Sequence, residues 1–124
     1  MAQHILIVED DPIGRKVVVD YLKAQGYVVT VARTGPEGIE KATRERPDLV
    51  LCDVLLPQKS GFEVCFEIKR AEATRNVPVI FMSAVCKDAY SEYYASIDLR
   101  AQGYLVKPFA MSTMLERVRQ VLAS

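Results

Sequence analysis

The sequence contains few of the residues that build disulfide frameworks and zinc sites. It has three cysteines, Cys52, Cys65 and Cys86, with no Cys-x-x-Cys spacing, and a single histidine, His4. An odd number of scattered cysteines argues against both kinds of structure. We therefore expect the cysteines to be small buried hydrophobic side chains, with a reactive thiol at Cys86 as the alternative.

Long apolar runs and an excess of charge of one sign are also missing. The apolar runs, such as residues 5–8, fall far short of the ~18 residues that a membrane-spanning helix needs, and no signal-type segment opens the chain. Sixteen basic residues balance sixteen acidic ones, which argues against binding nucleic acid through bulk positive charge. The basic residues, including Arg15 and Lys69, are expected on solvated helix faces. We expect a cytoplasmic protein that binds neither membrane nor nucleic acid directly.

The residues that are present fit one compact domain. Of the 124 residues, 50% are hydrophobic and 26% are charged, which is enough for a buried core without disulfide or metal staples. We expect residues 1–124 to form a single domain, with no output domain in the chain. The sequence fits both a stand-alone domain and a fragment of a longer protein.

Short apolar runs alternate along the chain with segments of helical spacing. The runs are typical of strands covered on both faces, and they occupy residues 5–8, 28–32, 49–52, 79–82 and 104–106. Helices are expected from Pro12 after the N-cap residue Asp11, from Thr34 to about Glu45, from about Gly61, over residues 88–100 and over residues 111–122. This alternation predicts an α/β fold with a parallel sheet and helices on both of its faces.

Polar residues follow the predicted strands, at the ends where a parallel sheet forms its binding site. Glu9 and Asp10 follow the first strand, Asp53 the third, Ser83 the fourth and Lys107 the fifth. Taken singly, each is well explained as part of a solvated turn. Together they predict a pocket that contains three carboxylates, a hydroxyl and an ammonium group.

The predicted pocket suits a hard divalent cation and a phosphoryl group. Neighbouring carboxylates repel one another unless a cation neutralises them, and oxygen ligands without Cys or His suit Mg²⁺ or Mn²⁺. Asp53 could then attack a phosphoryl group and form an acyl phosphate, while Lys107 offsets charge on the transferring oxygens. Ser83 could donate a hydrogen bond to those oxygens. The residues alone therefore favour metal-assisted phosphoryl chemistry.

The motifs around these residues closely resemble those of the receiver domains of two-component response regulators. The resemblance spans nearly the whole chain, and the combination of segments is specific although each one alone is weak. The matching segments are residues 5–11 (ILIVEDD), 53–57 (DVLLP) with 60–63 (SGFE), 78–84 (PVIFMSA) and 104–109 (YLVKPF). The resemblance implies a flavodoxin-like, doubly wound sheet of five parallel strands in the order 2-1-3-4-5, with five helices.

The resemblance also implies a role for each site residue. Asp53 would accept a phosphoryl group from a histidine kinase or a histidine phosphotransfer protein. Glu9, Asp10 and Asp53 would hold Mg²⁺, or Mn²⁺, together with the backbone carbonyl of Leu55. Lys107 would pair with the phosphoryl group, and the peptide bond that follows this lysine is often cis in the family. Such a domain is a phosphoacceptor that slowly loses its phosphoryl group rather than a turnover enzyme.

A two-state switch is a further implication of the resemblance. Ser83 and Tyr104 match the family's switch pair, in which the hydroxyl moves toward the phosphoryl group and the aromatic ring turns inward. The altered surface, formed by the helix expected over residues 88–100, the strand over 104–106 and the last helix, would bind a downstream protein or a second copy of the chain. Considered by itself, Tyr104 is also explained as an edge-strand aromatic residue.

Two positions depart from the family pattern near the phosphoacceptor. Many receivers carry polar residues two positions beyond the phosphorylated aspartate and two beyond the switch hydroxyl, where they help to position hydrolytic water. This chain has Leu55 and Val85 there. Apolar side chains cannot orient water by hydrogen bonding, so we predict a comparatively long-lived phosphoryl group.

The stretch between Ser83 and Lys107 also departs from the family pattern, because it is slightly longer than usual. Residues 100–103 (RAQG) replace the familiar Gly-Ala-Asp, and Tyr90, Tyr93 and Tyr94 crowd the preceding segment. Aromatic residues are favoured at recognition surfaces, which fits an adapted output or dimer face. The alternative is that these tyrosines pack their helix onto the sheet.

Other classes of function remain as alternatives. A degenerate receiver that is never phosphorylated would act as a constitutive interaction module, although such domains usually lack the acidic residues. A flavin-binding protein of similar fold would need a phosphate loop rich in Ser, Thr and Gly after the first strand. An aspartate-based phosphatase would need a second catalytic Asp where Leu55 stands. The residues present favour the phosphoacceptor.

Overall fold

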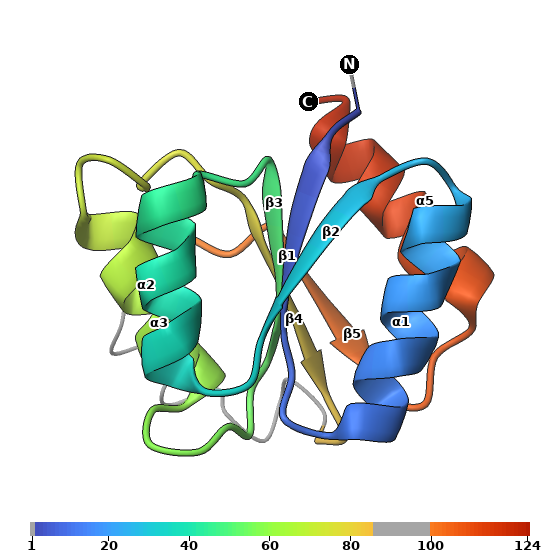
Figure 1. The fold of residues 1–124 in the computed structure, drawn as a ribbon, viewed down its shortest axis with the longest axis horizontal. Helices are drawn as coiled ribbons and strands as arrows, with labels where there is room; N and C mark the ends of the chain where they lie inside the picture. The colour runs from blue at the N-terminus through green and yellow to red at the C-terminus, as the bar shows by residue number, and fades with distance from the viewer. Residues whose placement is uncertain (1, 86–99) are drawn as a thin grey trace.

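The computed structural model describes residues 2–85 and 100–124 and contains the predicted alternation of strands and helices (Figure 1). The strands agree with the sequence prediction to within one residue at each end. None of the described helices combines the length and the apolar character that a membrane span needs. The helix expected over residues 88–100 lies almost entirely outside the described residues, as do Cys86, Tyr90, Tyr93 and Tyr94. The described elements are β1 (His4–Val8), α1 (Pro12–Ala24), β2 (Val28–Ala32), α2 (Gly35–Glu45), β3 (Leu49–Asp53), α3 (Gly61–Arg70), β4 (Val79–Ser83), β5 (Gly103–Val106) and α5 (Met111–Leu122).

The strands form one parallel sheet in the order β2-β1-β3-β4-β5, as the resemblance implied. Helices α1 and α5 cover one face of the sheet, and α2 and α3 cover the other (Figure 1). The register places Val8 beside Cys52 and Asp53 beside Met82, so the carboxyl ends of β1, β3 and β4 lie together. The strand order reverses between β1 and β3, and ligands of such sheets bind outside the carboxyl ends at this point.

The sheet separates two hydrophobic layers. Along β1, Ile5 and Ile7 pack with residues of α1 and α5, whereas Leu6 and Val8 pack with residues of α2 and α3. Because successive side chains of a strand point to opposite faces, a strand covered on both sides needs apolar residues at every position. This requirement explains why β1, β3 and β4 read as continuous apolar runs.

Two of the cysteines lie in the layer between the sheet and the helices α2 and α3. Cys52 and Cys65 are both buried within this hydrophobic layer, as expected from the sequence. Burial raises the pKa of Cys65 to about 12, and it also raises the pKa of Cys52. Both thiols therefore stay protonated and act as packing groups.

Side-chain caps fix the points at which three helices begin. Asp11 and Thr34 each accept a hydrogen bond from the backbone N–H three residues later, at 3.0 and 3.2 Å. Ser60 and Glu63 form a reciprocal capping box at the start of α3. Each cap satisfies backbone donors that the helix leaves unpaired. The caps also hold the loops that leave β1, β2 and β3 at the carboxyl edge of the sheet.

Lys69 is buried near the amino ends of the strands, at the other end of the sheet from the acidic residues. This position corrects the expectation of a solvated side chain. Only 3% of the residue is exposed, and its Nζ donates hydrogen bonds to the carbonyl of Val77 at 2.7 Å and to Oε1 of Gln102 at 3.1 Å. Both acceptors are uncharged, and burial lowers the pKa of Lys69 below its usual value. Gln102 also accepts a hydrogen bond from Val79 N at 2.8 Å. The lysine thereby ties the end of α3 to the start of β4 and to the segment that leads into β5.

Candidate functional site

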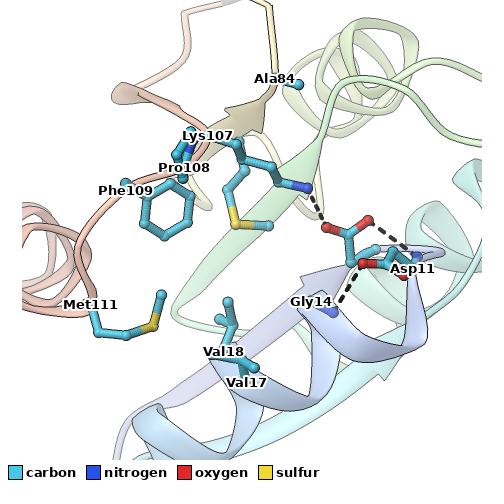
Figure 2. Close-up of a pocket in the computed structure, with 11 residues that line it drawn as sticks. Asp11, Gly14, Val17, Val18, Ala84, Lys107, Pro108, Phe109 and Met111 are labelled. Atoms are coloured by element: carbon cyan, nitrogen blue, oxygen red, sulfur yellow. Dashed lines mark hydrogen bonds and ion pairs between the residues drawn. The ribbon is translucent and has the colours of Figure 1, made fainter.

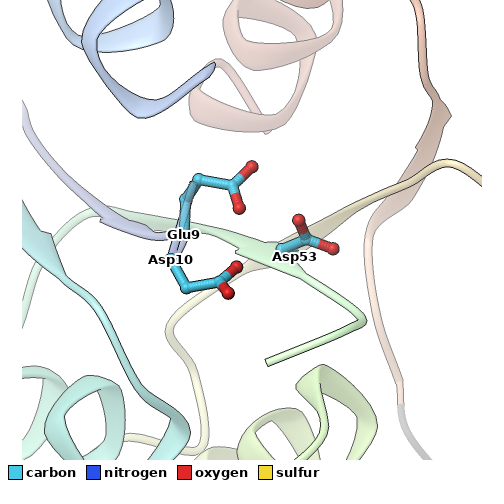
Figure 3. A group of neighbouring side chains, drawn as sticks. All are labelled: Glu9, Asp10 and Asp53. Atoms are coloured by element: carbon cyan, nitrogen blue, oxygen red, sulfur yellow. The ribbon is translucent and has the colours of Figure 1, made fainter. Parts of the chain in front are cut away.

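Three acidic side chains meet at the carboxyl edge of the sheet (Figure 3). Glu9 and Asp10 follow β1, and Asp53 is the last residue of β3. Each offers one carboxylate oxygen, and these oxygens lie within 4.8 Å of one another. Glu9 and Asp53 are buried, whereas Asp10 is exposed. The structure therefore brings together the three acids that the sequence proposed as metal ligands.

Lys107, in the loop between β5 and α5, contacts two of these acids. Its Nζ lies 2.5 Å from Oε1 of Glu9 and 2.7 Å from Oδ2 of Asp53. Burial alone would lower the pKa of Lys107, but hydrogen bonds to Asp53 and Glu9 raise it above its usual value. The Lys107–Pro108 peptide bond is cis, as the resemblance implied. The site thus holds a permanent positive charge against the side chain of Asp53.

The cluster carries more negative charge than this one ammonium offsets. Burial, together with the neighbouring Asp53, raises the pKa of Glu9 from 4.5 to about 7, although Lys107 acts in the opposite direction. Carboxylates that resist ionisation in this way mark a site where further positive charge is favourable. An all-oxygen donor set without Cys or His is the set that Mg²⁺ and Mn²⁺ prefer. The residues present therefore fit such an ion.

The loop after Asp53 is held tightly against the end of β3. Leu55 N donates a hydrogen bond to Oδ1 of Asp53 at 3.0 Å, and Gly61 N donates one to the carbonyl of Val54 at 2.7 Å. A Cβ atom at position 61 would lie 2.1 Å from the carbonyl oxygen of Asp53, so only glycine fits. The side chain of Leu55 is exposed, and the part of its carbonyl in metal binding stays a prediction.

Arg15 is a residue of this region that sequence reasoning missed. We expected a solvated side chain, but its Nη1 donates hydrogen bonds to the carbonyls of Glu9 at 3.0 Å and Asp10 at 3.4 Å. Asp11 N in turn donates to Oε2 of Glu9 at 3.3 Å. Arg15 thereby braces the turn that presents the acids. Its place in the first turn of the helix that follows the acids is a weak sequence signal, because any basic residue there can equally face solvent.

The proposed switch residues are linked through the backbone of one residue, Val85. Ser83 is fully buried at the end of β4, and its Oγ accepts a hydrogen bond from Val85 N at 3.1 Å. The hydroxyl of Tyr104 donates to the carbonyl of Val85 at 2.6 Å. The ring of Tyr104 packs edge-on against Phe81, with 6.1 Å between ring centroids. A displacement of Val85 would therefore reach both side chains.

A cavity of about 470 Å³ opens beside Lys107, between α1 and α5 (Figure 2). Glu9, Asp11 and Lys107 form its polar end. Apolar side chains make most of its remaining wall, among them Val17, Val18, Met82, Phe109 and Met111. The sequence did not indicate this cavity, because it is formed by segments that are distant along the chain.

Comparison with known sequences places the chain among signalling proteins. The sequence model of the response regulator receiver domain matches residues 5–119. The chain is 35% identical over 122 residues to the response regulator MprA of Mycobacterium ulcerans, covering 98% of this chain and 51% of that protein. It is 36% identical over 118 residues to MprA of Mycobacterium leprae, with coverage of 95% and 50%. The chain spans about half the length of the curated relatives it matches.

Solved structures show the same fold. The receiver domain of the sensor histidine kinase PA1611 from Pseudomonas aeruginosa PAO1 superposes with a TM-score of 0.90 and 31% identity, covering 100% of both chains. That structure has a magnesium ion coordinated in its active site cleft. A CheY-like receiver domain protein from Methanospirillum hungatei JF-1 superposes with a TM-score of 0.89 and 26% identity, covering 99% of this chain and 95% of that one.

Proposed function

The chain belongs to the response regulator receiver domain family, and on this premise we propose that it is a phosphorylation switch in which Asp53 is the phosphoacceptor. Domains of this family are phosphoacceptor signalling domains rather than turnover enzymes. The observation that carries the proposal is the surroundings of Asp53, whose Oδ2 lies 2.7 Å from Lys107 Nζ within a cluster of two further acids. A carboxylate held beside a fixed ammonium is suited to attack a phosphoryl group.

The proposed donor is a phosphohistidine of a histidine kinase or histidine phosphotransfer protein. An oxygen of Asp53 forms a bond to phosphorus while the bond from phosphorus to the histidine nitrogen breaks. The electron pair of the broken bond stays on that nitrogen, which takes up a proton from water. Lys107 stabilises the negative charge on the phosphoryl oxygens during this exchange. The product is an aspartyl phosphate on the receiver and an unmodified histidine on the donor.

Glu9, Asp10 and Asp53 are the proposed ligands of a Mg²⁺ ion, together with the backbone carbonyl of Leu55. Mn²⁺ would suit the same oxygens. When bound, such an ion offsets the charge of both the carboxylates and the phosphoryl oxygens. Asp11 has a different part in this scheme, because its carboxylate already accepts the capping hydrogen bond from Gly14 N at 3.0 Å.

The proposed output of phosphorylation begins at Ser83. Its buried hydroxyl is expected to leave Val85 N and turn toward the new phosphoryl group, which frees the N–H of the residue whose carbonyl accepts from Tyr104. The ring of Tyr104 would follow, and the surface around β5 and α5 would change with it. A downstream protein, or a second copy of this chain, is the proposed reader of that surface.

Intact-mass spectrometry tests the proposal. The protein is incubated with phosphoramidate and Mg²⁺, and a single phosphoryl adduct is expected. The adduct should be absent from the Asp53→Asn variant and from a sample that contains EDTA. A folded protein that binds Mg²⁺ but gains no adduct would reject the phosphoacceptor and favour the constitutive interaction module.

A further inference from the structure

The cavity between α1 and α5 shares two residues with the phosphoacceptor site, and Asp11 lies beside them in its wall (Figure 2). Lys107 and Glu9 belong to its wall, and Lys107 Nζ is also 2.7 Å from Oδ2 of Asp53. The remaining wall comes largely from Val17 of α1, Met82 of β4 and the residues that follow Lys107. A molecule in this cavity would therefore have one end beside the phosphoacceptor and the other among hydrocarbon and thioether groups.

The size and composition of the cavity suit a small aromatic group. Its volume of about 470 Å³ lies within the usual range of small-molecule sites and well above the roughly 150 Å³ that hold a benzene ring. Two thioethers, from Met82 and Met111, and the ring of Phe109 belong to the wall. Sulfur atoms and aromatic rings both make favourable contacts with an aromatic ring. A phosphoryl group that reaches Asp53 would keep its leaving group close to the polar end of this cavity.

We propose that this cavity seats the acyl part of an aromatic acyl phosphate, so that such a compound is a preferred small-molecule phosphodonor for Asp53. The inference rests on the proposed function of Asp53. In the reaction, an Asp53 oxygen forms a bond to phosphorus and the bond between phosphorus and the acyl oxygen breaks. The electron pair of the broken bond leaves with the acyl group, which departs as a carboxylate without needing a proton. Lys107, which lines the cavity and contacts Asp53, would offset that negative charge.

Rates of phosphorylation with three donors test the proposal. The donors are benzoyl phosphate, acetyl phosphate, which has a methyl group in place of the ring, and phosphoramidate, which has no acyl group. Adduct formation is followed by intact mass with Mg²⁺ present. Val17→Phe fills the cavity from a half-exposed position, and Ile13→Phe adds the same ring one turn earlier on α1, at a site that is 76% exposed and outside the cavity.

The benzoyl phosphate rate constant is expected to fall about tenfold in Val17→Phe, which corresponds to losing part of the burial of one aromatic ring. The rate constants for acetyl phosphate and phosphoramidate should stay within about twofold of the unmodified protein, as should all three in Ile13→Phe. If Val17→Phe slows all three donors equally, or slows none, the cavity does not select the donor. It would then be available for a helix of a protein partner.

A binding measurement separates this inference from the proposed function. The Asp53→Asn variant, labelled at its methionine methyl groups, is titrated with benzoyl phosphonate, a donor analogue that cannot transfer its phosphorus. The NMR signals of Met82 and Met111 should shift, whereas that of the buried Met114 should not. Unshifted signals would overturn the inference even if phosphoramidate labels Asp53 normally. Failure of every donor to label the unmodified protein would instead reject the proposed function, and the inference with it.

Discussion

Leu55 and Val85 are apolar residues beside the proposed phosphorylation site. Their backbone N–H groups bind the carboxylate of Asp53 and the hydroxyl of Ser83, which are both proposed to meet the phosphoryl group. Leu55 N donates a hydrogen bond to Asp53 and Val85 N donates one to Ser83. The side chains of Leu55 and Val85 are therefore attached to the backbone at the edge of the site. Neither side chain can accept a hydrogen bond from water, and an attacking water molecule therefore lacks a partner there. This arrangement favours slow hydrolysis of the aspartyl phosphate.

The double variant Leu55→Asn, Val85→Glu should shorten the half-life of the phosphorylated protein on the order of tenfold, because each new side chain can orient water. Decay of the phosphoryl adduct is followed by intact mass after removal of the donor. Leu55→Val, Val85→Ile is the matched apolar control and should leave the half-life unchanged. Equal half-lives in both double variants would contradict the explanation.

Single residues differ in how well the sequence indicates their part in the site. Glu9, Asp53 and Ser83 stand directly at strand ends, and their meeting follows from parallel strands alone. The contacts of Arg15 with two backbone carbonyls depend on the direction of a long flexible side chain, which no local pattern determines. The bridge from Lys107 to two carboxylates likewise required the structure. The assignment of roles to these residues came from the family motifs.

At the scale of the secondary-structure elements, the backbone at the start of α3 packs in close contact with the backbone at the end of β3. Gly61 opens the helix against the backbone of Asp53 and Val54, and a Cβ atom there would lie 2.1 and 2.8 Å from their atoms. Backbone atoms of a central strand cannot move aside cheaply. The close approach brings the capping box of Ser60 up to the phosphoacceptor loop.

Gly61→Ala should therefore lower the free energy of unfolding by about 3 kcal/mol and slow phosphorylation of Asp53. Gly103→Ala is the control, because a Cβ atom there would meet its nearest neighbour at 3.4 Å. Urea unfolding and labelling with phosphoramidate provide the two readings. Equal stability of the two variants would show that the contact at position 61 relaxes without cost.

The elements themselves were largely predictable, because each depends on local patterns. Continuous apolar runs predicted the strands, and Asp11 and Thr34 predicted where two of the helices begin. The closeness of α3 to β3 was not predictable, since a glycine in a loop more often supplies a turn than a contact surface. The length of α3 also stayed open, because the sequence prediction gave only its approximate start.

At the scale of the whole molecule, Lys69 couples stability to pH. Burial lowers the pKa of Lys69 in the folded state below its usual 10.5. Between the lowered value and 10.5, the unfolded chain binds more protons than the folded protein, so stability rises with pH in this window. Below the window the folded state bears the full cost of burying the charge, and above it that cost is gone.

The difference in unfolding free energy between the unmodified protein and Lys69→Met should therefore change in favour of the unmodified protein as pH rises through this window. Urea unfolding at several pH values up to about 10.5 measures it, and all other titrating groups are common to both proteins. Lys16→Met, at an exposed lysine, is the matched control for the loss of a lysine side chain. A constant difference for Lys69→Met would contradict the expected linkage.

The outline of the whole fold was predictable from the sequence, but the layers and the strand order were predictable for different reasons. Alternating strands and helices required a parallel sheet with two helical layers. Alternation alone leaves several strand orders open, and the order β2-β1-β3-β4-β5 came with the family motifs. The tie from Lys69 to Gln102 could not be foreseen, because it joins residues 33 positions apart through a side chain expected in solvent.

The division of the core by the sheet has a consequence for how such a protein can diversify. Substitutions among the side chains beneath α1 and α5 lie on the far side of the strands from those beneath α2 and α3, so their effects on stability should combine almost independently. One layer can therefore be remodelled, and with it the cavity beside Lys107, while the other keeps the loop of Asp53 in place. The apolar layer that borders the cavity and the layer that packs behind the loop of Asp53 lie on opposite faces of one sheet.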